Sequence, residues 1–286
     1  MLGLETPVER LQHMNQPAYE FYLNRNPGID LAADRLEIGV CAQHNNGGID
    51  VDLWWRSSIA GLFPVGEAAG AHGVARPGGA ALNSAQVGAT RAAQWIAARE
   101  QGAARADEGW QELAGDALQK ARSLLEAACG REESSGVLID DVLMESTRAM
   151  SDNAGLVRSR QGLEELARNV AEWRRRVVDE CVVDPTSRRS VDRLFLVRDI
   201  LDVQAVYVAA MLDHLDHGVG SRGSVLYTDP DGDLPVSWWN DGADLDVEEI
   251  FRHRLDSKAH HGVTQRVSVD AVGEAIHAHW GPVRPI

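Results

Sequence analysis

Cysteine is scarce in this sequence, and the few cysteines lie far apart. The 286 residues include three, Cys41, Cys129 and Cys181, and no two of them form a CxxC pair. An odd number of widely spaced cysteines excludes a disulfide framework and gives no zinc-binding pattern. We therefore expect a cytoplasmic protein, from a reducing compartment, that holds no metal.

Long apolar runs and an excess of basic charge are also missing. No stretch of about 18 apolar residues occurs, and the beginning of the chain lacks the basic flank and apolar core of a secretion signal. Lysine and arginine total 28 against 43 aspartates and glutamates, a formal net charge of −15. Such a charge repels phosphate backbones. The sequence predicts no membrane span and no nucleic-acid partner.

One glycine pattern is absent from the place where it would matter. No GxGxxG segment lies between a predicted strand and a predicted helix, which is the arrangement that holds the pyrophosphate of a dinucleotide. The apolar share of 44% is nevertheless enough for a sizeable core in a chain of this length. We expect the chain to fold, but without a complete dinucleotide-binding unit of its own.

Helical periodicity dominates the middle of the chain. Apolar residues recur every three and four positions in four consecutive segments, which is typical of amphipathic helices. Four such helices in a row predict an antiparallel bundle. The four segments are 110–128, 137–150, 163–180 and 193–217.

Before the bundle, short apolar runs alternate with glycine clusters. This alternation is typical of strands joined by tight turns. A helix should follow, with Asn83 or Ser84 as its N-cap, and its many alanines permit close packing. The three expected strands are 36–40, 49–53 and 61–65.

The two ends of the chain have patterns of their own. Residues 5–23 have helical spacing that is interrupted at Pro17. After the bundle, turn-forming residues predict an extended arm, followed by a short helix over Val269–Ala278. On a helix His277 and His279 would lie on different faces, so we expect them to be solvated and not to bind a metal together.

The region 41–88 holds the densest group of unusual residues, because its glycine-rich turns carry His44, Glu67 and Arg76. Glycines let backbone N–H groups approach a flat ligand. The phrases QHNNGGIDVD, SSIAGLFPVGEAAG, HGVAR and PGGAAL resemble, in order and spacing, the C-terminal half of the flavin-binding domain in the succinate dehydrogenase and fumarate reductase flavoprotein family. MSDNAGLVRS and GSRGSVLYTDP resemble phrases of that family's helical domain more weakly.

The resemblance implies that this region contacts the cofactor FAD. The glutamate of the GE pair binds the ribityl or ribose part of the flavin cofactor in such proteins, which corresponds to Glu67 here. The backbone N–H groups of Ala81 and Leu82 would face the pyrimidine edge of the flavin, and Gly47 and Gly48 would lie beside the cofactor.

The resemblance also implies a site for a small carboxylate substrate. His44 and Arg76 would clamp the carboxylate, with the backbone near Gly79 assisting, because an arginine fork fits a carboxylate. Many family members have Asn-Ser before the leucine where this chain has Ala80 and Ala81, so only backbone contacts carry over. No residue of this chain corresponds to a catalytic group.

The fold implied by the resemblance is α+β and mostly helical. It comprises the C-terminal part of a Rossmann-like FAD-binding domain, an antiparallel helical bundle and an extended C-terminal arm. The expected divisions are a remnant of a linking or capping domain at 1–35, the FAD-domain part at 36–103, the bundle at 104–222 and the arm at 223–286.

Two functions stay open at this point. In the first, the chain is the C-terminal portion of an FAD-dependent oxidoreductase that passes hydride between flavin and a carboxylate-bearing substrate, with a separate N-terminal flavin-domain chain as partner. In the second, it is a truncated, non-catalytic remnant or interaction subunit, such as a homodimer, that does not bind FAD alone. Either function leaves this chain inactive by itself.

Overall fold

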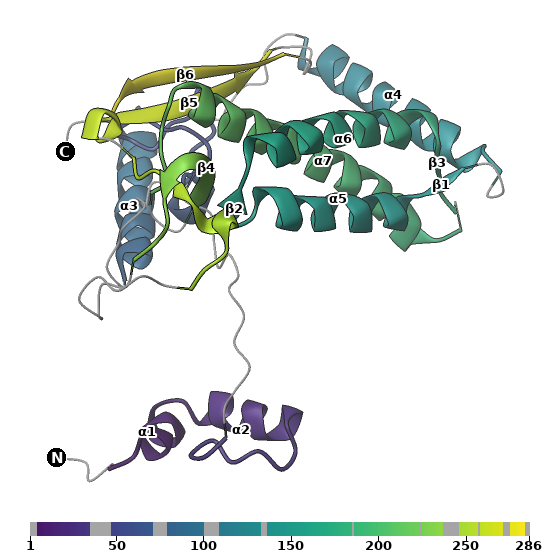
Figure 1. The fold of residues 1–286 in the computed structure, drawn as a ribbon. Coiled ribbons are helices and arrows are strands. Elements are labelled where there is room, and N and C mark those ends of the chain that lie inside the picture. Colours follow the sequence, from purple (N-terminus) through teal and green to yellow (C-terminus); the bar gives the residue numbers. More distant parts are fainter. Residues whose placement is uncertain are drawn as a thin grey trace. The chain divides into compact units, whose positions relative to one another are not determined.

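The computed structural model contains two compact units, residues Met1–Asn45 and Asn46–Ile286, which are described separately (Figure 1). The described residues are 5–34, 47–70, 79–99, 109–132, 136–184, 186–222, 225–236, 246–256, 258–270 and 275–283. No helix among these residues is both long enough and apolar enough to cross a membrane.

The first unit is a pair of short helices separated by Asn15. A capping box starts the first helix, because Thr6 Oγ1 accepts the N–H of Glu9 and the Glu9 carboxylate accepts the N–H of Thr6. The expected interruption therefore falls at Asn15, and Pro17 lies in the first turn of the second helix, where a proline is tolerated. Neither helix buries a residue. The two helices are α1 (Pro7–Met14) and α2 (Gln16–Arg25).

The second unit is mostly helical, as the sequence predicts, and its strands are short. Helices of the expected bundle follow one another with brief connections. In chain order the elements are η1 (Gly66–Ala68), α3 (Ala80–Arg99), α4 (Trp110–Cys129), β1 (Val137–Leu138), α5 (Ile139–Ala154), β2 (Val157–Arg158), α6 (Arg160–Asp179), β3 (Cys181–Val182), α7 (Arg188–Asp216), β4 (Leu226–Asp233), η3 (Glu249–Phe251), η4 (Lys258–His260), β5 (Val263–Val269) and β6 (Ile276–Pro282).

Two small parallel strand pairs establish the up-and-down order of the bundle. β1 precedes α5 and pairs with β3, which lies between α6 and α7, with Val137 opposite Cys181. β2 lies between α5 and α6 and pairs with β4, which follows α7, with Val157 opposite Leu226. The first pair therefore joins one end of the three helices and the second pair joins the other end. Helices α5, α6 and α7 alternate in direction, as Figure 1 shows.

The core of the second unit lies between these helices. On α6 the buried side chains recur every three and four residues, which confirms the predicted amphipathic face. Trp173 reaches the edge of this core and donates its indole N–H to Glu145 at 3.0 Å. The largest fully buried side chains include Val142, Leu163, Leu166, Val170, Val177, Leu194, Val197, Leu201 and Val208.

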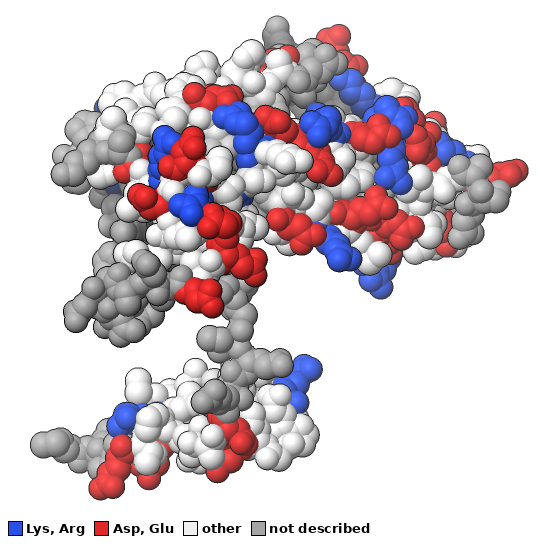
Figure 2. Space-filling model, in the orientation of Figure 1, with Lys and Arg blue, Asp and Glu red and all other residues white. Residues whose placement is uncertain are grey.

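The outer side of the bundle carries both signs of charge. Figure 2 shows acidic and basic side chains interleaved over it. Arg175 of α6, for example, forms ion pairs with Glu172, Asp179 and Glu180. Exposed pairs of this kind contribute little to stability. The bundle is therefore stabilised mainly by its apolar interior.

Residues 218–223, which follow α7, read GVGSRG and match the spacing of the GxGxxG motif. Gly218 has a φ of +67° and its N–H donates to the carbonyl of Leu215, while the N–H of Val219 donates to that of His214. This is the Schellman arrangement that ends a helix. A pyrophosphate loop needs a strand before it and a helix after it, whereas here α7 precedes and β4 follows. The pattern therefore ends a helix and is no nucleotide-binding loop.

The prediction of a short helix over Val269–Ala278 is wrong. β5 and β6 form an antiparallel hairpin instead, with Arg266 opposite His279. β5 reads VTQRVSV, and its β-branched residues favour an extended chain that its partner strand can pair with. On a strand, residues two apart point to the same side, so His277 and His279 share a face. The extended character of the C-terminal arm is confirmed, and its final helix is not.

The prediction of strands before α3 is also wrong for the residues that the structure describes. Residues 49–53 and 61–65 form turns and irregular chain, and 36–40 lies outside the described residues. Their backbone groups bond locally, since the N–H of Ser57 donates to Leu62 at 3.0 Å. A strand needs a continuous neighbour for its backbone groups, whereas these groups bond within turns or, at Ile49, to the single carbonyl of Ala68.

Candidate functional site

Two glycine turns lie side by side in residues 47–70. We call the described residues 47–70 and 79–99 the glycine-rich segment. The N–H of Ile49 donates to the carbonyl of Ala68 at 2.9 Å. Gly70 has a φ of +59°, and a Cβ there would overlap the backbone of Gly47. Because a side chain is excluded on both grounds, glycine at this position brings the GGI and GEAAG turns together.

Glu67 lies at the centre of the second turn, on η1. Its side chain is exposed. The preceding Gly66 has a φ of +62° and faces Ala85 of α3, where a Cβ would lie 3.2 Å from the methyl group of that alanine. The turn therefore packs against α3 through glycine and alanine. This packing leaves the Glu67 carboxylate available to a ligand.

Helix α3 begins earlier than the sequence predicts. Gly79 has a φ of +80°, and its carbonyl accepts the first helical hydrogen bond, from the N–H of Asn83 at 3.1 Å. The expected N-caps, Asn83 and Ser84, lie inside the helix instead. The left-handed glycine supplies the non-helical residue, which makes a side-chain cap at those positions unnecessary.

The start of α3 presents backbone donors. N–H groups of the first turn precede the first hydrogen bond of a helix and have no acceptor within it. Ala81 and Leu82 belong to this turn, and Leu82 is 72% exposed. The helix dipole adds partial positive charge at the same end. The arrangement suits a negatively charged or hydrogen-bond-accepting edge of a ligand.

Helix α3 also holds the loop that connects the two turns. The Trp55 indole packs on Gly88, where a Cβ would lie 2.6 Å from its Nε1 atom. Trp55 has a φ of +59°, unusual for a residue with a side chain. Arg91 donates to the carbonyl of Leu53 at 3.1 Å. Sequence reasoning missed these contacts, although the glycine within an alanine-rich helix was a signal for close packing.

A carboxylate in this loop is held in its charged form. Partial burial raises the pKa of Asp52, but hydrogen bonds from the Arg56 side chain and from the backbone N–H groups of Arg56 and Trp54 outweigh it and lower the pKa below its ordinary value. Asp52 thereby stiffens the turn, since it accepts several hydrogen bonds within five residues.

The predicted site residues are placed unequally. Gly47 and Gly48 lie against the turn that carries Glu67, because a Cβ on Gly48 would contact the backbone of 68–70. Gly79, Ala81 and Leu82 lie at the start of α3. The two predicted substrate ligands, His44 and Arg76, lie outside the described residues.

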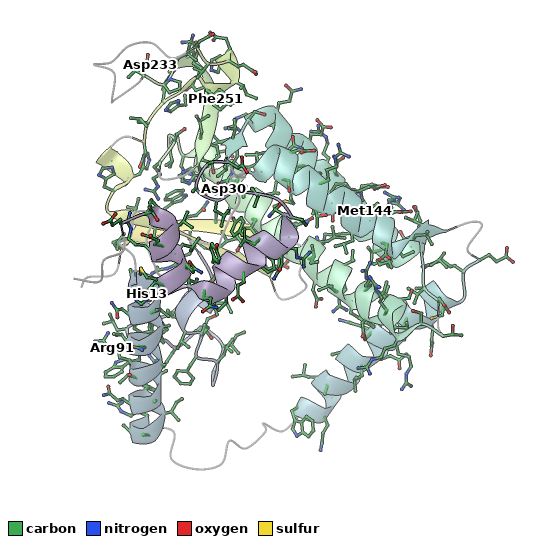
Figure 3. All side chains as sticks on the ribbon, turned by 90° about the horizontal axis from the view of Figure 1, so that it is seen from below. His13, Asp30, Arg91, Met144, Asp233 and Phe251 are labelled. Atoms are coloured by element: carbon green, nitrogen blue, oxygen red, sulfur yellow. The ribbon has the colours of Figure 1, made fainter. Side chains whose placement is uncertain are left out.

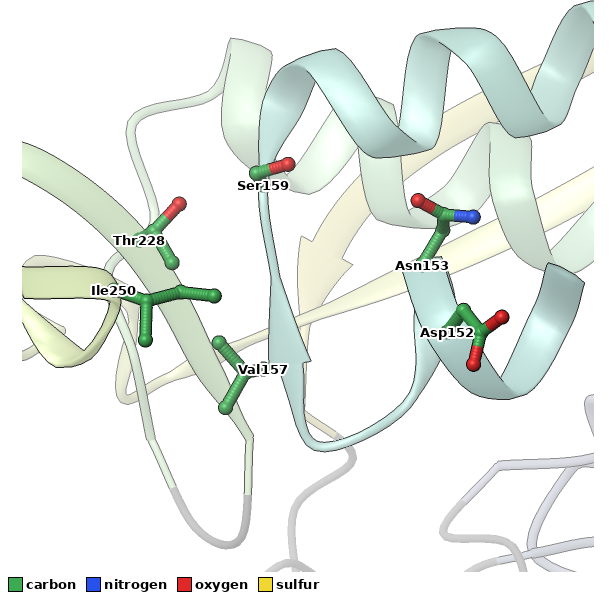
Figure 4. Close-up of a pocket in the computed structure, with 6 residues that line it drawn as sticks. All are labelled: Asp152, Asn153, Val157, Ser159, Thr228 and Ile250. Atoms are coloured by element: carbon green, nitrogen blue, oxygen red, sulfur yellow. The ribbon is translucent and has the colours of Figure 1, made fainter. Parts of the chain in front are cut away.

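A separate cavity of about 300 Å³ lies between α5, β2, β4 and η3 (Figure 4). Its polar groups are two hydroxyls, one amide and one carboxylate, and its described lining contains no lysine, arginine or histidine. Such a lining offers no counter-charge to a carboxylate substrate. The lining residues are Asp152, Asn153, Val157, Ser159, Thr228 and Ile250.

A buried polar cluster joins the end of α7 to the C-terminal arm. Asp256, whose side chain is 2% exposed, pairs with Arg222 at 3.3 Å and with His260 at 2.9 Å. His214 stacks on Tyr227 with ring centroids 5.3 Å apart. Burial, assisted by the charge of Arg222, lowers the pKa of His214 to about 4. This cluster is a structural junction.

Among the described residues, no group of three or more histidine, cysteine, aspartate or glutamate side chains is arranged to hold a metal ion. Cys181 is fully buried, and burial raises the pKa of its thiol to about 11. A thiol of that pKa is not a nucleophile at neutral pH. The glycine-rich segment is therefore the part of the described chain best suited to bind a ligand.

Comparison with known proteins bears on this site. No protein-family model matches the chain. Among curated proteins the chain is similar to one of the subunits of fumarate reductase (CoM/CoB) from Methanothermobacter marburgensis, with 39% identity over 66 residues. These residues are 23% of this chain and 12% of that protein.

Solved structures extend the comparison to almost the whole chain. A mutant of quinol fumarate reductase FrdA from E. coli superimposes with a TM-score of 0.72 and 20% identity, over 97% of this chain and 43% of that one. A quinol-fumarate reductase solved with menaquinol molecules superimposes with a TM-score of 0.66 and 20% identity, over 97% of this chain and 44% of that one. Mycobacterium smegmatis Sdh1 in complex with UQ1 superimposes with a TM-score of 0.62 and 18% identity, over 98% of this chain and 42% of that one.

The predicted resemblance to the succinate dehydrogenase and fumarate reductase flavoproteins is thus confirmed. The chain has the fold of the C-terminal part of their flavoprotein subunits. It spans less than half the length of the solved proteins it matches.

Proposed function

We propose that this chain forms the C-terminal part of an FAD-dependent oxidoreductase similar to the flavoprotein subunits of fumarate reductase and succinate dehydrogenase. One observation carries the proposal. The turns at 47–49 and 66–70 are held side by side against α3, and they coincide with the phrases that resemble the flavin-binding domain of that family. The division of the chain into FAD-domain part, bundle and arm belongs to the same proposal.

The described residues fit one part of a flavin. An exposed carboxylate at Glu67 can accept hydrogen bonds from the hydroxyl groups of the ribityl or ribose part. The N–H groups of Ala81 and Leu82 can donate to the pyrimidine edge, and Gly47 and Gly48 leave room for a close approach. FAD, when bound, supplies the atom that carries hydride, and the residues named here bind and orient it.

We further propose that His44 and Arg76 bind the carboxylate of a small substrate, with the backbone near Gly79 assisting. A guanidinium fork donates two parallel hydrogen bonds to a carboxylate. The positive end of α3, which begins just after Gly79, favours negative charge in the same region. Within an acidic protein this would be a local site of positive potential.

We propose that the remainder of the FAD site comes from an N-terminal flavin domain. Support comes from the relative lengths, since this chain spans less than half of each solved relative. The described residues also contain no strand, glycine loop and helix in the order that a pyrophosphate requires.

The test is to produce the full chain together with an N-terminal flavin domain and to measure bound FAD by its visible absorbance. We expect a yellow complex. Glu67→Gln should weaken FAD binding by about tenfold or more, because a charged acceptor with two oxygens is replaced by a neutral amide with one. Glu112→Gln on α4, in the first turn of a helix outside the site, is the matched control.

A colourless, well-folded complex would contradict the proposal. The chain alone provides the comparison with the second function, a remnant or interaction subunit. That alternative predicts a stable dimer that binds no FAD in either preparation, and the proposed oxidoreductase predicts FAD binding when the N-terminal domain is present.

A further inference from the structure

We infer that five side chains on and beside α3 form a docking surface for an acidic polypeptide segment that also carries apolar side chains. We call this surface the Arg–Trp patch, and the inference does not depend on bound flavin. Its members are Trp54, Arg56, Arg91, Trp95 and Arg99.

The patch is preassembled by contacts between its own members. The guanidinium of Arg56 lies 4.0 Å from the ring centroid of Trp95, and that of Arg99 lies 4.9 Å from it. Trp54 tilts against Trp95 at 5.6 Å between centroids, and Arg91 lies over Trp54 at 5.7 Å. Long side chains that are already ordered lose less conformational freedom when a partner binds.

The patch is exposed, and so is the apolar surface around it. Trp54 is 38% exposed, and the three arginines are exposed along the loop and the helix. Figure 3 shows Arg91 on α3, directed away from the helix axis. Exposed aliphatic side chains lie close by in sequence on the same two elements, at Leu53, Val87 and Ile96. Tryptophan and arginine are the residues most enriched where interfaces bind most strongly.

The contacts that fasten the loop to α3 use only part of this surface, since Arg91 donates to the carbonyl of Leu53 and Arg56 binds Asp52. The loop is held by the Trp55 indole on Gly88 and by the turn around Asp52. Arg99 belongs to neither contact, and its guanidinium lies over the Trp95 ring. The stacking of Arg99 on Trp95 is therefore not needed to fasten the loop.

Charge identifies the partner. The patch and the turn beside it contain three arginines, Arg56, Arg91 and Arg99, and one carboxylate, Asp52, in a chain whose formal net charge is −15. Asp52 neutralises Arg56 through an ion pair, which leaves Arg91 and Arg99 as the positive members of the patch. A carboxylate-bearing segment is attracted here and repelled by the rest of the chain, which restricts how it can dock. The same repulsion acts against a nucleic acid, whose phosphate charges extend far beyond the patch.

The experiment measures binding of three short fluorescent peptides of equal length to the full chain by fluorescence anisotropy. The first alternates glutamate with leucine and phenylalanine, the second replaces glutamate by lysine, and the third replaces the apolar residues by serine. We expect the first peptide to bind most tightly, and its binding to weaken as salt screens the charges.

Two variants of the patch are compared with one control. Arg91→Glu combined with Arg99→Glu should lower the affinity for the acidic apolar peptide by about tenfold or more. The same double variant should bind the lysine peptide more tightly than the unmodified chain does. Trp54→Ala should lower the affinity for the acidic apolar peptide and leave the affinity for the serine peptide unchanged. The control combines Arg148→Glu with Arg188→Glu, two highly exposed arginines of the bundle, and should change none of these affinities.

Equal affinities of the unmodified chain and the Arg91/Arg99 variant for the acidic apolar peptide would overturn the inference. Tighter binding of a single-stranded oligonucleotide than of that peptide, lost in the same variant, would also overturn it in favour of a nucleic acid. A dimer that dissociates only in the variant would mean that a second copy of the chain occupies the patch. Circular dichroism shows whether each variant is folded, and its FAD binding with the N-terminal domain tests the proposed function separately.

Discussion

The bundle and the glycine-rich segment are stabilised in different ways. Most buried apolar side chains among the described residues lie in and around α5, α6 and α7, where they form one continuous cluster. In the glycine-rich segment the buried apolar residues are Val51, Ala69 and Ala92, which are small. The same segment exposes larger ones, at Ile49, Leu53, Trp54, Ile59, Leu62, Leu82, Val87 and Ile96.

This difference separates two ways of ordering a chain. The bundle gains its stability from apolar burial, which depends on the area removed from water. The glycine-rich segment takes its shape from turns, backbone hydrogen bonds and glycines that permit close approach, with little apolar burial. It follows that the bundle can be stable by itself, whereas the glycine-rich segment has apolar surface left to be covered by a ligand or by another polypeptide.

The largest effect is expected from shortening a core side chain of the bundle. Leu163 is fully buried on α6. Leu163→Ala should lower the free energy of unfolding by about 2–5 kcal/mol, because it removes apolar contacts and leaves a cavity. Urea unfolding followed by far-ultraviolet circular dichroism measures the change.

The same substitution in the glycine-rich segment is the matched control. Leu82→Ala should change the free energy of unfolding by less than about 0.5 kcal/mol, because its side chain is exposed. Equal losses from the two substitutions would remove the distinction between the regions.

A smaller effect is expected where the C-terminal hairpin joins the bundle. The Asp213 carboxylate of α7 accepts hydrogen bonds from Gln265 at 2.6 Å and from the Trp280 indole at 2.8 Å. Asp213→Ala should destabilise this junction by about 1.5–3 kcal/mol, the range for hydrogen bonds to charged groups. Hydrogen exchange of β5 and β6 measures the loss. Asp192→Ala, at an exposed ion pair on the same helix, should leave that exchange unchanged.

Acid should weaken the bundle through His214. Burial, together with Arg222 and against the attraction of Asp256, lowers its pKa from 6.5 to about 4 in the folded protein. Between these values the unfolded chain binds more protons than the folded chain, so stability falls as the pH drops from about 6.5 towards 4. Urea midpoints at about pH 7 and about pH 5 should differ less in His214→Phe than in the unmodified chain. His277→Phe, at an exposed position, should retain the full difference.

The smallest effect is expected from substitutions at two glycines whose backbone is in the left-handed conformation. Gly218 ends α7 and Gly61 lies in the glycine-rich segment, and a Cβ at either would meet nothing within 4 Å. Alanine at each position therefore tests backbone strain alone, about 1–2 kcal/mol. Gly218→Ala should lower the urea midpoint of the bundle. Gly61→Ala should leave that midpoint unchanged and increase hydrogen exchange only near its own turn.

The bundle was predictable because each of its helices carries a long repeat of apolar residues. Such a repeat is visible without knowledge of the partner, as the buried face of α6 shows. The hairpin of β5 and β6 was not predictable in the same way. The alanines and histidines of β6 allow a helix, and its extended form depends on pairing with β5 along seven residue pairs.

The candidate site was predictable only in part. The order of the phrases indicated the glycine-rich turns that carry Gly47 and Glu67, and the structure adds the contact of these turns at Gly47 and Gly70. The contact of Trp55 with Gly88 joins residues far apart in sequence that belong to no recognised phrase. The roles of His44 and Arg76 stay predictions, because these residues lie outside the described part of the chain.

The two strand pairs at the ends of the bundle restrict how its length can change. α6 begins just after β2 and ends just before β3, so both of its ends are attached to other parts of the chain. One inserted residue would lengthen it by about 1.5 Å and rotate everything beyond by about 100°. Deletions and insertions should therefore be tolerated better between α4 and β1 than within α6. A reporter peptide inserted for labelling belongs in that connection.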